Sequence, residues 1–262
     1  MNTQKDLKIE VSDGAAIPRR RDPGMFNAWR FTLVGTIIAI ISLVIFKPDP
    51  YLRIIKFVPD GILITFQITF LSIFLSLIVG LFTGLGRLSR NRLINLMASV
   101  YVEVIRGIPL LVQLFYIYYA LGTFFRIHPF TAAVTAMTIC YGAYMGEVFR
   151  AGIQSIDKGQ TEAARSLGFS KSQTMFYVII PQAMRTILPP VGNEFIALLK
   201  DTSLVSILAV SDLLRRGREF ATQTFAYFET YTMVALIYLM ITLLLSKIVS
   251  IMEEKVKPYD QK

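Results

Sequence analysis

The sequence predicts an all-α, polytopic membrane protein, and three observations support that fold class. The 262-residue chain is 54% hydrophobic and only 17% charged, with a mean hydropathy of +0.54, whereas about a quarter of the residues in a soluble domain are charged. It contains long apolar runs, and crossing a hydrocarbon core of about 30 Å takes roughly 20 mostly apolar residues. Its lysines and arginines gather between these runs. The candidate spans are residues 31–46, 61–86, 108–125, 127–146, 187–199 and 231–246.

The chain starts with a polar tail, residues 1–28, followed by a first apolar segment, residues 29–46. The tail mixes charges of both signs and holds few large apolar side chains, so we expect no packed structure there. The apolar segment lacks a small-residue cleavage site and should remain as an uncleaved first helix. Anionic lipid headgroups beside the membrane explain the run Arg19-Arg20-Arg21.

The placement of basic residues predicts which side each loop faces. With a cytoplasmic N-terminus, most of the lysines and arginines fall inside, which is the bias that sets orientation. Both termini, including the last residues 256–262, are therefore expected in the cytoplasm. Arg215, Arg216 and Arg218 run against this bias in a loop of the opposite side. We attribute the net charge of +9 to topology and expect no nucleic-acid partner.

We expect no catalytic residue, no metal site and no cofactor bound by this chain. Cys140 and His128 are each the only residue of their type, so an intrachain disulfide and a zinc site built from these ligand types are excluded. The sequence contains no Gly-Lys-Ser/Thr, and so it lacks the loop that cradles the phosphates of ATP.

A soluble-looking helical segment, residues 150–185, lies between strongly apolar runs and is expected to dock a partner. Glu162 should lie in the first turn of a helix, where the helix dipole favours a carboxylate. The two alanines after it should lie on the helix surface, where small side chains can enter a partner's cleft. The alternative is purely structural: Glu162 starts the helix and Gly168 ends it. The candidate docking residues are Gly159, Glu162, Ala163, Ala164 and Gly168.

A second short helix should follow at an angle to the first. Ser170 can cap it while Gln173 reaches back, as in a capping box. Pro181 should end it, because proline lacks a donor and restricts the residue before it.

Two carboxylates in the fifth apolar run are candidates for ligand contact. Glu194 and Asp201 are seven residues apart and share one helical face if the helix extends that far. Acidic groups at membrane depth face a cavity or a partner, and their expected guest is cationic, such as the ammonium group of an amino acid. Alternatively, Glu194 pairs with a basic side chain and Asp201 pairs with Lys200 or caps the next turn. Pro189-Pro190 should loosen this helix, which we expect to line the path.

Gln113 is a further polar side chain in an apolar run, and it either binds the ligand or bonds to a neighbouring helix. Glu103 and Arg106 are spaced to form a neutral pair on a helix. The small-residue motifs at 80–84 and 142–146 permit close helix contact, more within the subunit than between subunits.

Several of these stretches together resemble the permease subunits of bacterial ABC importers. The docking segment has the form of their cytoplasmic loop, in Glu162-Ala163-Ala164, Gly168 and Ile180-Pro181. Residues 101–113 (YVEVIRGIPLLVQ), 141–151 and 193–204 (NEFIALLKDTSL) are similar to the polar amino-acid uptake branch. The resemblance covers about residues 57–255, and the motifs occur in the family's order.

The resemblance implies a five-helix importer core in the bacterial inner membrane, to which this chain adds one N-terminal helix. It implies two separate ATPase subunits that bind ATP and Mg²⁺, a second permease subunit, either a copy or a sister chain, and an extracytoplasmic amino-acid-binding protein. The docking segment would be the coupling helix, and the chain would not be an enzyme. Residues Glu194, Asp201 and Gln113 are the candidate contacts for a polar amino acid.

Two other function classes remain open from the residues alone. An ion-coupled secondary transporter would explain the intramembrane carboxylates, but we find no convincing internal repeat, and a docking segment would have no role. An intramembrane hydrolase would need a nucleophile with a base, or metal ligands, and no such pattern occurs.

Overall fold

The computed structural model describes residues 28–256, and every element in this range is helical. The tail, residues 1–27, with the Arg19-Arg20-Arg21 run, and residues 257–262 lie outside the described part. The α-helices are α1 (Ala28–Phe46), α2 (Pro48–Phe57), α3 (Pro59–Arg87), α4 (Arg92–Gly107), α5 (Leu110–Phe115), α6 (Pro129–Gln154), α7 (Lys158–Ser166), α8 (Lys171–Thr174), α9 (Ile180–Asp201), α10 (Leu213–Thr224) and α11 (Tyr227–Val256). The π- and 3-10-helical turns are η1 (Tyr116–Ala120), η2 (Leu121–Thr123), η3 (Met175–Ile179) and η4 (Thr202–Leu208).

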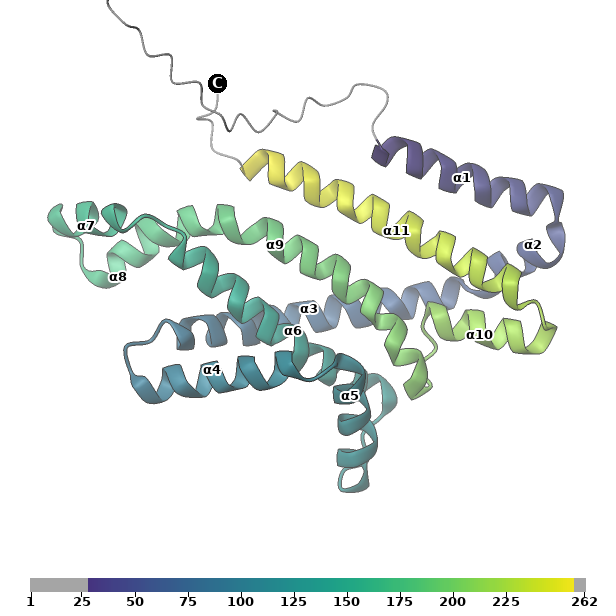
Figure 1. Ribbon diagram of the computed structural model, residues 1–262, viewed down its shortest axis with the longest axis horizontal. Coiled ribbons are helices and arrows are strands. Elements are labelled where there is room, and N and C mark those ends of the chain that lie inside the picture. Colours follow the sequence, from purple (N-terminus) through teal and green to yellow (C-terminus); the bar gives the residue numbers. More distant parts are fainter. Residues whose placement is uncertain (1–27, 257–262) are drawn as a thin grey trace, which may run out of the picture.

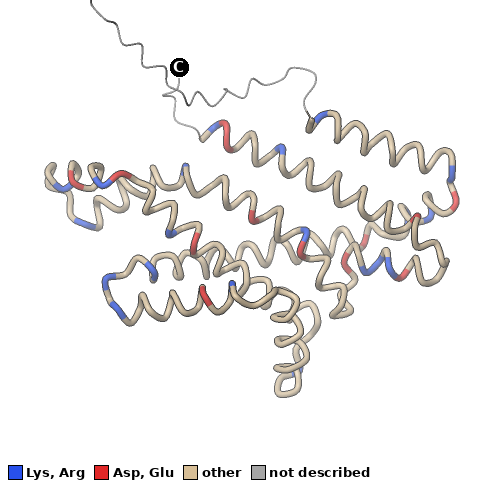
Figure 2. The backbone as a smooth tube through the Cα atoms, in the orientation of Figure 1, with Lys and Arg blue, Asp and Glu red and all other residues tan. Residues whose placement is uncertain are grey.

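The long helices lie side by side in a bundle with two distinct ends (Figure 1). Helices α3, α6 and α9 form its middle, α4 packs against α3 and α6, and α11 packs against α9. Helices α7 and α8 project at one end, which we term the coupling end, and α2 and α10 lie at the opposite end. Charged residues concentrate near these two ends, and few lie along the middle (Figure 2). This distribution suits a bundle that crosses a bilayer.

Three described helices, α1, α3 and α11, are long and apolar enough to cross a membrane. Helix α4 and the following segment Leu110–Thr123 qualify only as a pair, and they are bent by 101° relative to each other. The candidate span over residues 108–125 thus begins at this bend, and its helical part is Leu110–Thr123. Pro109 explains the break, because proline disfavours a helical conformation at Ile108, which is extended. Helices α6 and α9 are long but less apolar, and their crossing stays a prediction.

Helices α3 and α6 meet along a seam of small residues. A Cβ atom on Gly80 would lie 2.3 Å from Cβ of Met145, and one on Gly146 would lie 2.7 Å from Cγ2 of Thr83. Such distances leave no room for a side chain at either glycine. The predicted close packing of the two motifs within the subunit is confirmed, and the two helices form one tightly packed unit.

Helix α1 lies at the edge of the bundle, against α2 and α11. Only one of its side chains, Thr36, is buried, and Phe31 and Phe46 are more than four-fifths exposed. Trp29 Nε1 donates a hydrogen bond to the carbonyl oxygen of Leu243 at 2.7 Å. The expected first helix exists, and a single face attaches it to the remaining bundle.

Candidate functional site

The coupling segment begins with a capped helix. Asp157 is the N-cap of α7 and accepts a hydrogen bond from the Gly159 amide at 2.7 Å. Because the helix starts at Lys158, Glu162 lies beyond the first turn, and the prediction that it interacts with the helix start is wrong. Glu162 and Ala163 are exposed, as expected of docking residues.

Ala164 differs from its prediction, because it is buried rather than on the surface. Helix α7 packs against η3, and this contact covers the alanine face on that side. The small side chain of Ala164 therefore allows two helical segments to approach each other. Of the two alanines, only Ala163 is exposed and free to contact a partner.

Gly168 ends α7 as predicted, with φ +89°, a conformation that favours glycine. The Phe169 amide donates to the Ala164 carbonyl at 3.2 Å, and the Gly168 amide donates to the Arg165 carbonyl at 3.1 Å. This pair of bonds is a Schellman motif. A full capping box between Ser170 and Gln173 then starts α8, which confirms that prediction.

Pro181 does not end the second helix, contrary to the prediction. The chain is helical from α8 through η3 into α9, and Pro181 occupies the first turn of α9. A backbone N–H donor is not required in the first turn of a helix, so proline is tolerated there. The π-helical turn η3 shifts the backbone hydrogen-bond register just before Pro181. Gln182 donates to the Val178 carbonyl at 2.9 Å beside this turn. The coupling segment is thus joined to α9 by continuous helix.

The coupling segment also carries an apolar surface that sequence reasoning missed. Leu167, Phe176 and Tyr177 are all more than two-thirds exposed. These exposed apolar side chains are candidates for contact with a partner protein. Gln182 Nε2 lies 3.2 Å from Gln160 Oε1 and links α9 directly to α7. A force on α7 therefore has a direct path into α9.

Glu194 and Asp201 both lie in α9, so the helix continues far enough to place them on one face, as predicted. Tyr141 Oη donates to Asp201 Oδ2 at 2.8 Å. Lys200 makes no ion pair with Asp201 within the described chain, which disfavours the alternative of a local pair. Pro189 sits inside α9 without interrupting it, so the predicted loosening is not seen as a break in the helix.

Arg106 of α4 faces the same region, although the sequence predicted that it pairs with Glu103. Its Cζ atom lies 5.0 Å from the centre of the Tyr144 ring, and its charge acts on Glu194. The expected Glu103–Arg106 pair is not formed among residues 28–256. The bundle thus brings together a cation, two tyrosines and two carboxylates from α4, α6 and α9. Such a set can bind both ends of a zwitterion.

Gln113 lies at the bend between α4 and α5 and is almost fully buried. Its Nε2 atom donates to the carbonyl oxygens of Ile105 and Ile108, both at 2.8 Å. These bonds satisfy carbonyls that the end of α4 leaves without a helical partner. Gln113 therefore braces the bend, which is the helix-bonding alternative; its predicted ligand contact stays a prediction.

An ion network joins α3 and α6 near the coupling end. Glu147 of α6 pairs with Arg87 at the end of α3 and with Arg150 one turn further along α6. Arg150 Nε donates to Glu147 Oε2 at 3.0 Å. The spacing of Glu147 and Arg150 by three residues could have indicated their pairing. The pairing of Glu147 with Arg87, sixty residues away in the chain, could be found only from the folded structure.

At the opposite end, α10 is held by a buried carboxylate. Asp212 is fully buried and caps α10, accepting hydrogen bonds from the amides of Leu214 and Arg215 at 3.2 and 3.0 Å. The Leu213 amide donates to Thr65 Oγ1 of α3 at 3.1 Å. Burial raises the pKa of the Asp212 carboxyl to about 6, which its hydrogen bonds only partly offset.

A family model described as "binding-protein-dependent transport system inner membrane component" matches residues 72–258, which is more than half of the chain. The chain belongs to this family. It is therefore an inner-membrane transport component, and its class works with a binding protein.

The permease is 44% identical to the glutamine transport system permease protein of Escherichia coli strain K12 over 177 residues, covering 66% of this chain and 81% of that protein. It is 41% identical to the L-cystine transport system permease protein of Bacillus subtilis strain 168 over 201 residues, covering 76% and 86%. A crystal structure of an amino acid ABC transporter with histidines superimposes with a TM-score of 0.74 at 44% identity, covering 82% of the permease and 98% of that chain.

Proposed function

We propose that this chain is the membrane subunit of an ATP-driven importer that moves a polar amino acid into the cytoplasm by alternating access. Two ATPase subunits, each binding ATP and Mg²⁺, would dock on the coupling segment. A second permease subunit would complete the path, and an extracytoplasmic binding protein would deliver the amino acid. Both termini would lie in the cytoplasm, with the coupling end facing inward.

One observation carries this proposal: the capped helix α7 projects from the coupling end, and Leu167 at its end and Phe176 and Tyr177 in η3 are exposed beside it. An isolated secondary transporter has no need of such a docking surface. Continuous helix from α8 to α9 connects this surface with the helix that carries Glu194 and Asp201. ATP binding and hydrolysis in the partner could thereby move the groups that hold the cargo.

The cargo class follows from the related transporters and from the charges near the middle of the bundle. Relatives named for glutamine and L-cystine transport support a polar amino acid. Glu194 and Asp201 would hold its ammonium group, and Arg106 suits its carboxylate because a guanidinium matches carboxylate geometry. Glu194→Gln and Asp201→Asn should then each raise the KM for uptake by about tenfold, as expected for loss of one charged contact.

Reconstitution into vesicles tests the function. The complete complex should take up the amino acid when its binding protein is outside and ATP is inside, with no ion gradient. Uptake that requires a proton or sodium gradient and ignores ATP would instead establish an ion-coupled secondary transporter.

Variants of the coupling segment test the mechanism. Glu162→Lys and Gly168→Val should lower ATP-driven uptake more than tenfold while membrane insertion is unchanged. Asp49→Lys, a charge reversal at an exposed site of the opposite end, is the matched control and should leave uptake intact. Normal uptake by both coupling variants would contradict the proposal.

A further inference from the structure

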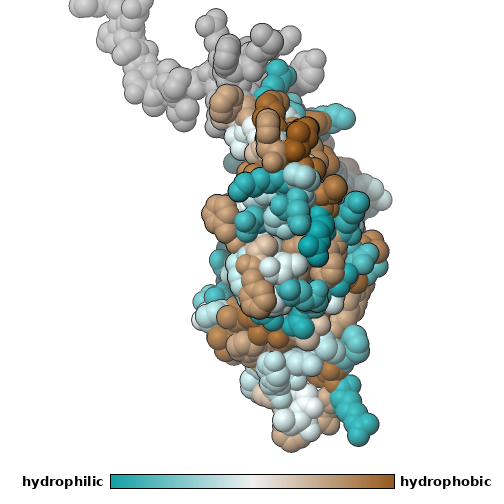
Figure 3. Space-filling model, turned by 90° about the vertical axis from the view of Figure 1, so that its right-hand side faces the viewer, coloured by the Kyte–Doolittle hydropathy of each residue, from teal (hydrophilic) through white to brown (hydrophobic). Residues whose placement is uncertain are grey.

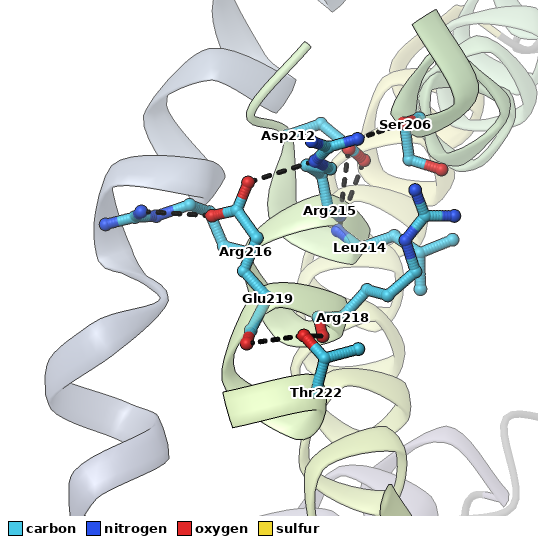
Figure 4. Close-up of polar contacts among 8 residues, drawn as sticks. All are labelled: Ser206, Asp212, Leu214, Arg215, Arg216, Arg218, Glu219 and Thr222. Atoms are coloured by element: carbon cyan, nitrogen blue, oxygen red, sulfur yellow. Dashed lines mark hydrogen bonds and ion pairs between the residues drawn. The ribbon is translucent and has the colours of Figure 1, made fainter. Parts of the chain in front are cut away.

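The three arginines of α10 that run against the charge bias are not equivalent (Figure 4). Arg215 pairs with Glu219 at 2.9 Å, and Arg216 pairs with both Glu219, at 3.2 Å, and Asp60, at 3.3 Å. The protein neutralises both guanidinium groups, and the Arg216–Asp60 pair also links α10 to α3. Arg218 is exposed and has no ion-pair partner among residues 28–256.

A second cation without an ion-pair partner in the described chain, Lys200, lies at the last turn of α9. Lys200 lines a crevice of about 320 Å³ between the ends of α9, α10 and α11, together with Leu214 and Tyr231. Arg218 follows Leu214 by four residues, so both occupy one face of α10, and Figure 4 shows the Arg218 side chain extending past Leu214. Two cations therefore flank one crevice.

The crevice lies at the level expected for lipid headgroups. Phe225, the C-cap residue of α10, and Phe228, in the first turn of α11, are 80% and 77% exposed, and aromatic side chains concentrate at the membrane–water interface. Viewed from this end, hydrophilic residues gather over the middle of the surface beside hydrophobic ones (Figure 3). The end of the bundle thus has the mixed character of an interface.

The crevice also has one polar and one apolar part. Ser203 and Tyr231 supply hydroxyl groups beside Lys200, whereas Ala235 of the same wall is small and exposed. One turn further along α11, Leu239 continues this exposed apolar stripe toward the middle of the helix. A ligand with an anionic head and a long apolar tail matches this order of side chains.

We propose that the crevice between α9, α10 and α11 binds an anionic phospholipid, with Lys200 and Arg218 holding its phosphate and the acyl chain lying along Ala235 and Leu239. The hydroxyl groups of Ser203 and Tyr231 donate to the remaining phosphate oxygens. The binding neutralises Lys200 and Arg218, for which the described chain offers no ion-pair partner. It does not depend on which solute the permease carries.

Lipid titration of the purified complex tests this proposal. Native mass spectrometry would follow binding of dioleoyl phosphatidylglycerol and of dioleoyl phosphatidylcholine to the complex in mild detergent. The unaltered complex should prefer phosphatidylglycerol. The double variant Lys200→Gln with Arg218→Gln should bind phosphatidylglycerol about tenfold more weakly, because it loses the attraction of two basic side chains to the anionic headgroup. Binding of phosphatidylcholine should change little.

Two further variants keep the result interpretable. Lys47→Gln removes an exposed cation between α1 and α2 and should leave the preference unchanged. Ala235→Phe keeps both cations but fills the crevice, and it should weaken phosphatidylglycerol binding as well. Unaltered lipid preference in the double variant would overturn the proposal. If that variant also lost capture of the binding protein or changed its oligomeric state, the two cations would be assigned to a protein interface instead.

Discussion

The α3–α6 seam and helix α1 represent opposite ways of packing an apolar helix. In the seam, glycines allow the two backbones to approach until a single added carbon would collide with its neighbour. Helix α1 is more uniformly apolar, yet it buries only Thr36 and leaves most of its surface free. The apolar character of a helix therefore indicates that it enters the membrane, whereas small residues indicate which helices pack tightly against each other.

A matched pair of glycine substitutions would test this contrast most strongly. Gly80→Leu should lower the free energy of unfolding by about 3 kcal/mol or more, because overpacking at a fixed seam displaces backbone. Gly35→Leu in α1 meets nothing within 4 Å and should change it by less than about 0.5 kcal/mol. Thermal unfolding of both proteins in detergent, followed by intrinsic fluorescence, measures the difference. Equal effects would remove the distinction between the two regions.

The buried carboxyl group of Asp212 should make the stability of the α10 end depend on pH. The folded chain holds the Asp212 proton with a pKa of about 6, against 3.8 for the ordinary side chain. The contribution of Asp212 to the free energy of unfolding should therefore be fully present below pH 4 and be lost as the pH rises to 6, by about 3 kcal/mol at 1.36 kcal/mol for each unit.

Unfolding of the unaltered chain and of Asp212→Asn, compared between pH 4 and pH 7, isolates this titration from the other carboxyl groups. The difference between the two proteins should change across that interval and level off above pH 6. A difference that stays constant with pH would show that Asp212 does not titrate there.

The ion pairs of the two regions should also differ in strength, with smaller effects on stability. Glu147→Gln should destabilise the α3–α6 unit by about 1–2 kcal/mol, because both Arg87 and Arg150 lose a partly buried acceptor. Arg53→Gln, in α2 beside α1, breaks a largely exposed pair with Asp49 and should cost less than about 0.5 kcal/mol. Denaturant unfolding at low and high salt would compare the two losses.

The smallest expected effect concerns the attachment of α1. Trp29→Phe keeps the ring but removes the hydrogen bond to the Leu243 carbonyl, which should cost about 1 kcal/mol. ATP-driven uptake should remain at the unaltered rate if α1 is an attachment. A large loss of uptake in a protein that unfolds at the normal temperature would assign α1 to the transport path.

Local patterns predicted the parts of the site whose geometry depends on neighbours in the chain. Gly168 and the pair Ser170 and Gln173 form the expected turn and capping box, because those hydrogen bonds connect residues a few positions apart. The role of Pro181 was mispredicted, since a preceding π-turn turned a helix-ending residue into a helix-starting one.

Contacts between distant helices were beyond such patterns. The approach of Arg106 to Tyr144, and the hydrogen bond from Tyr141 to Asp201, depend on how α4, α6 and α9 are arranged. The burial of Ala164 depends in the same way on η3. A sequence shows that a side chain is polar or small, but its partner depends on the packing of segments far apart in the chain.

Hydropathy, helix caps and motif order are properties of contiguous residues, and they were enough to predict a helical membrane component with a polar docking segment. The packing of distant helices was needed to show that Gln113 braces the bend between α4 and α5 and to show which charges are neutralised. The physical reason is that the cost of a buried polar or charged group depends on the groups packed around it, and these become neighbours only when the chain folds.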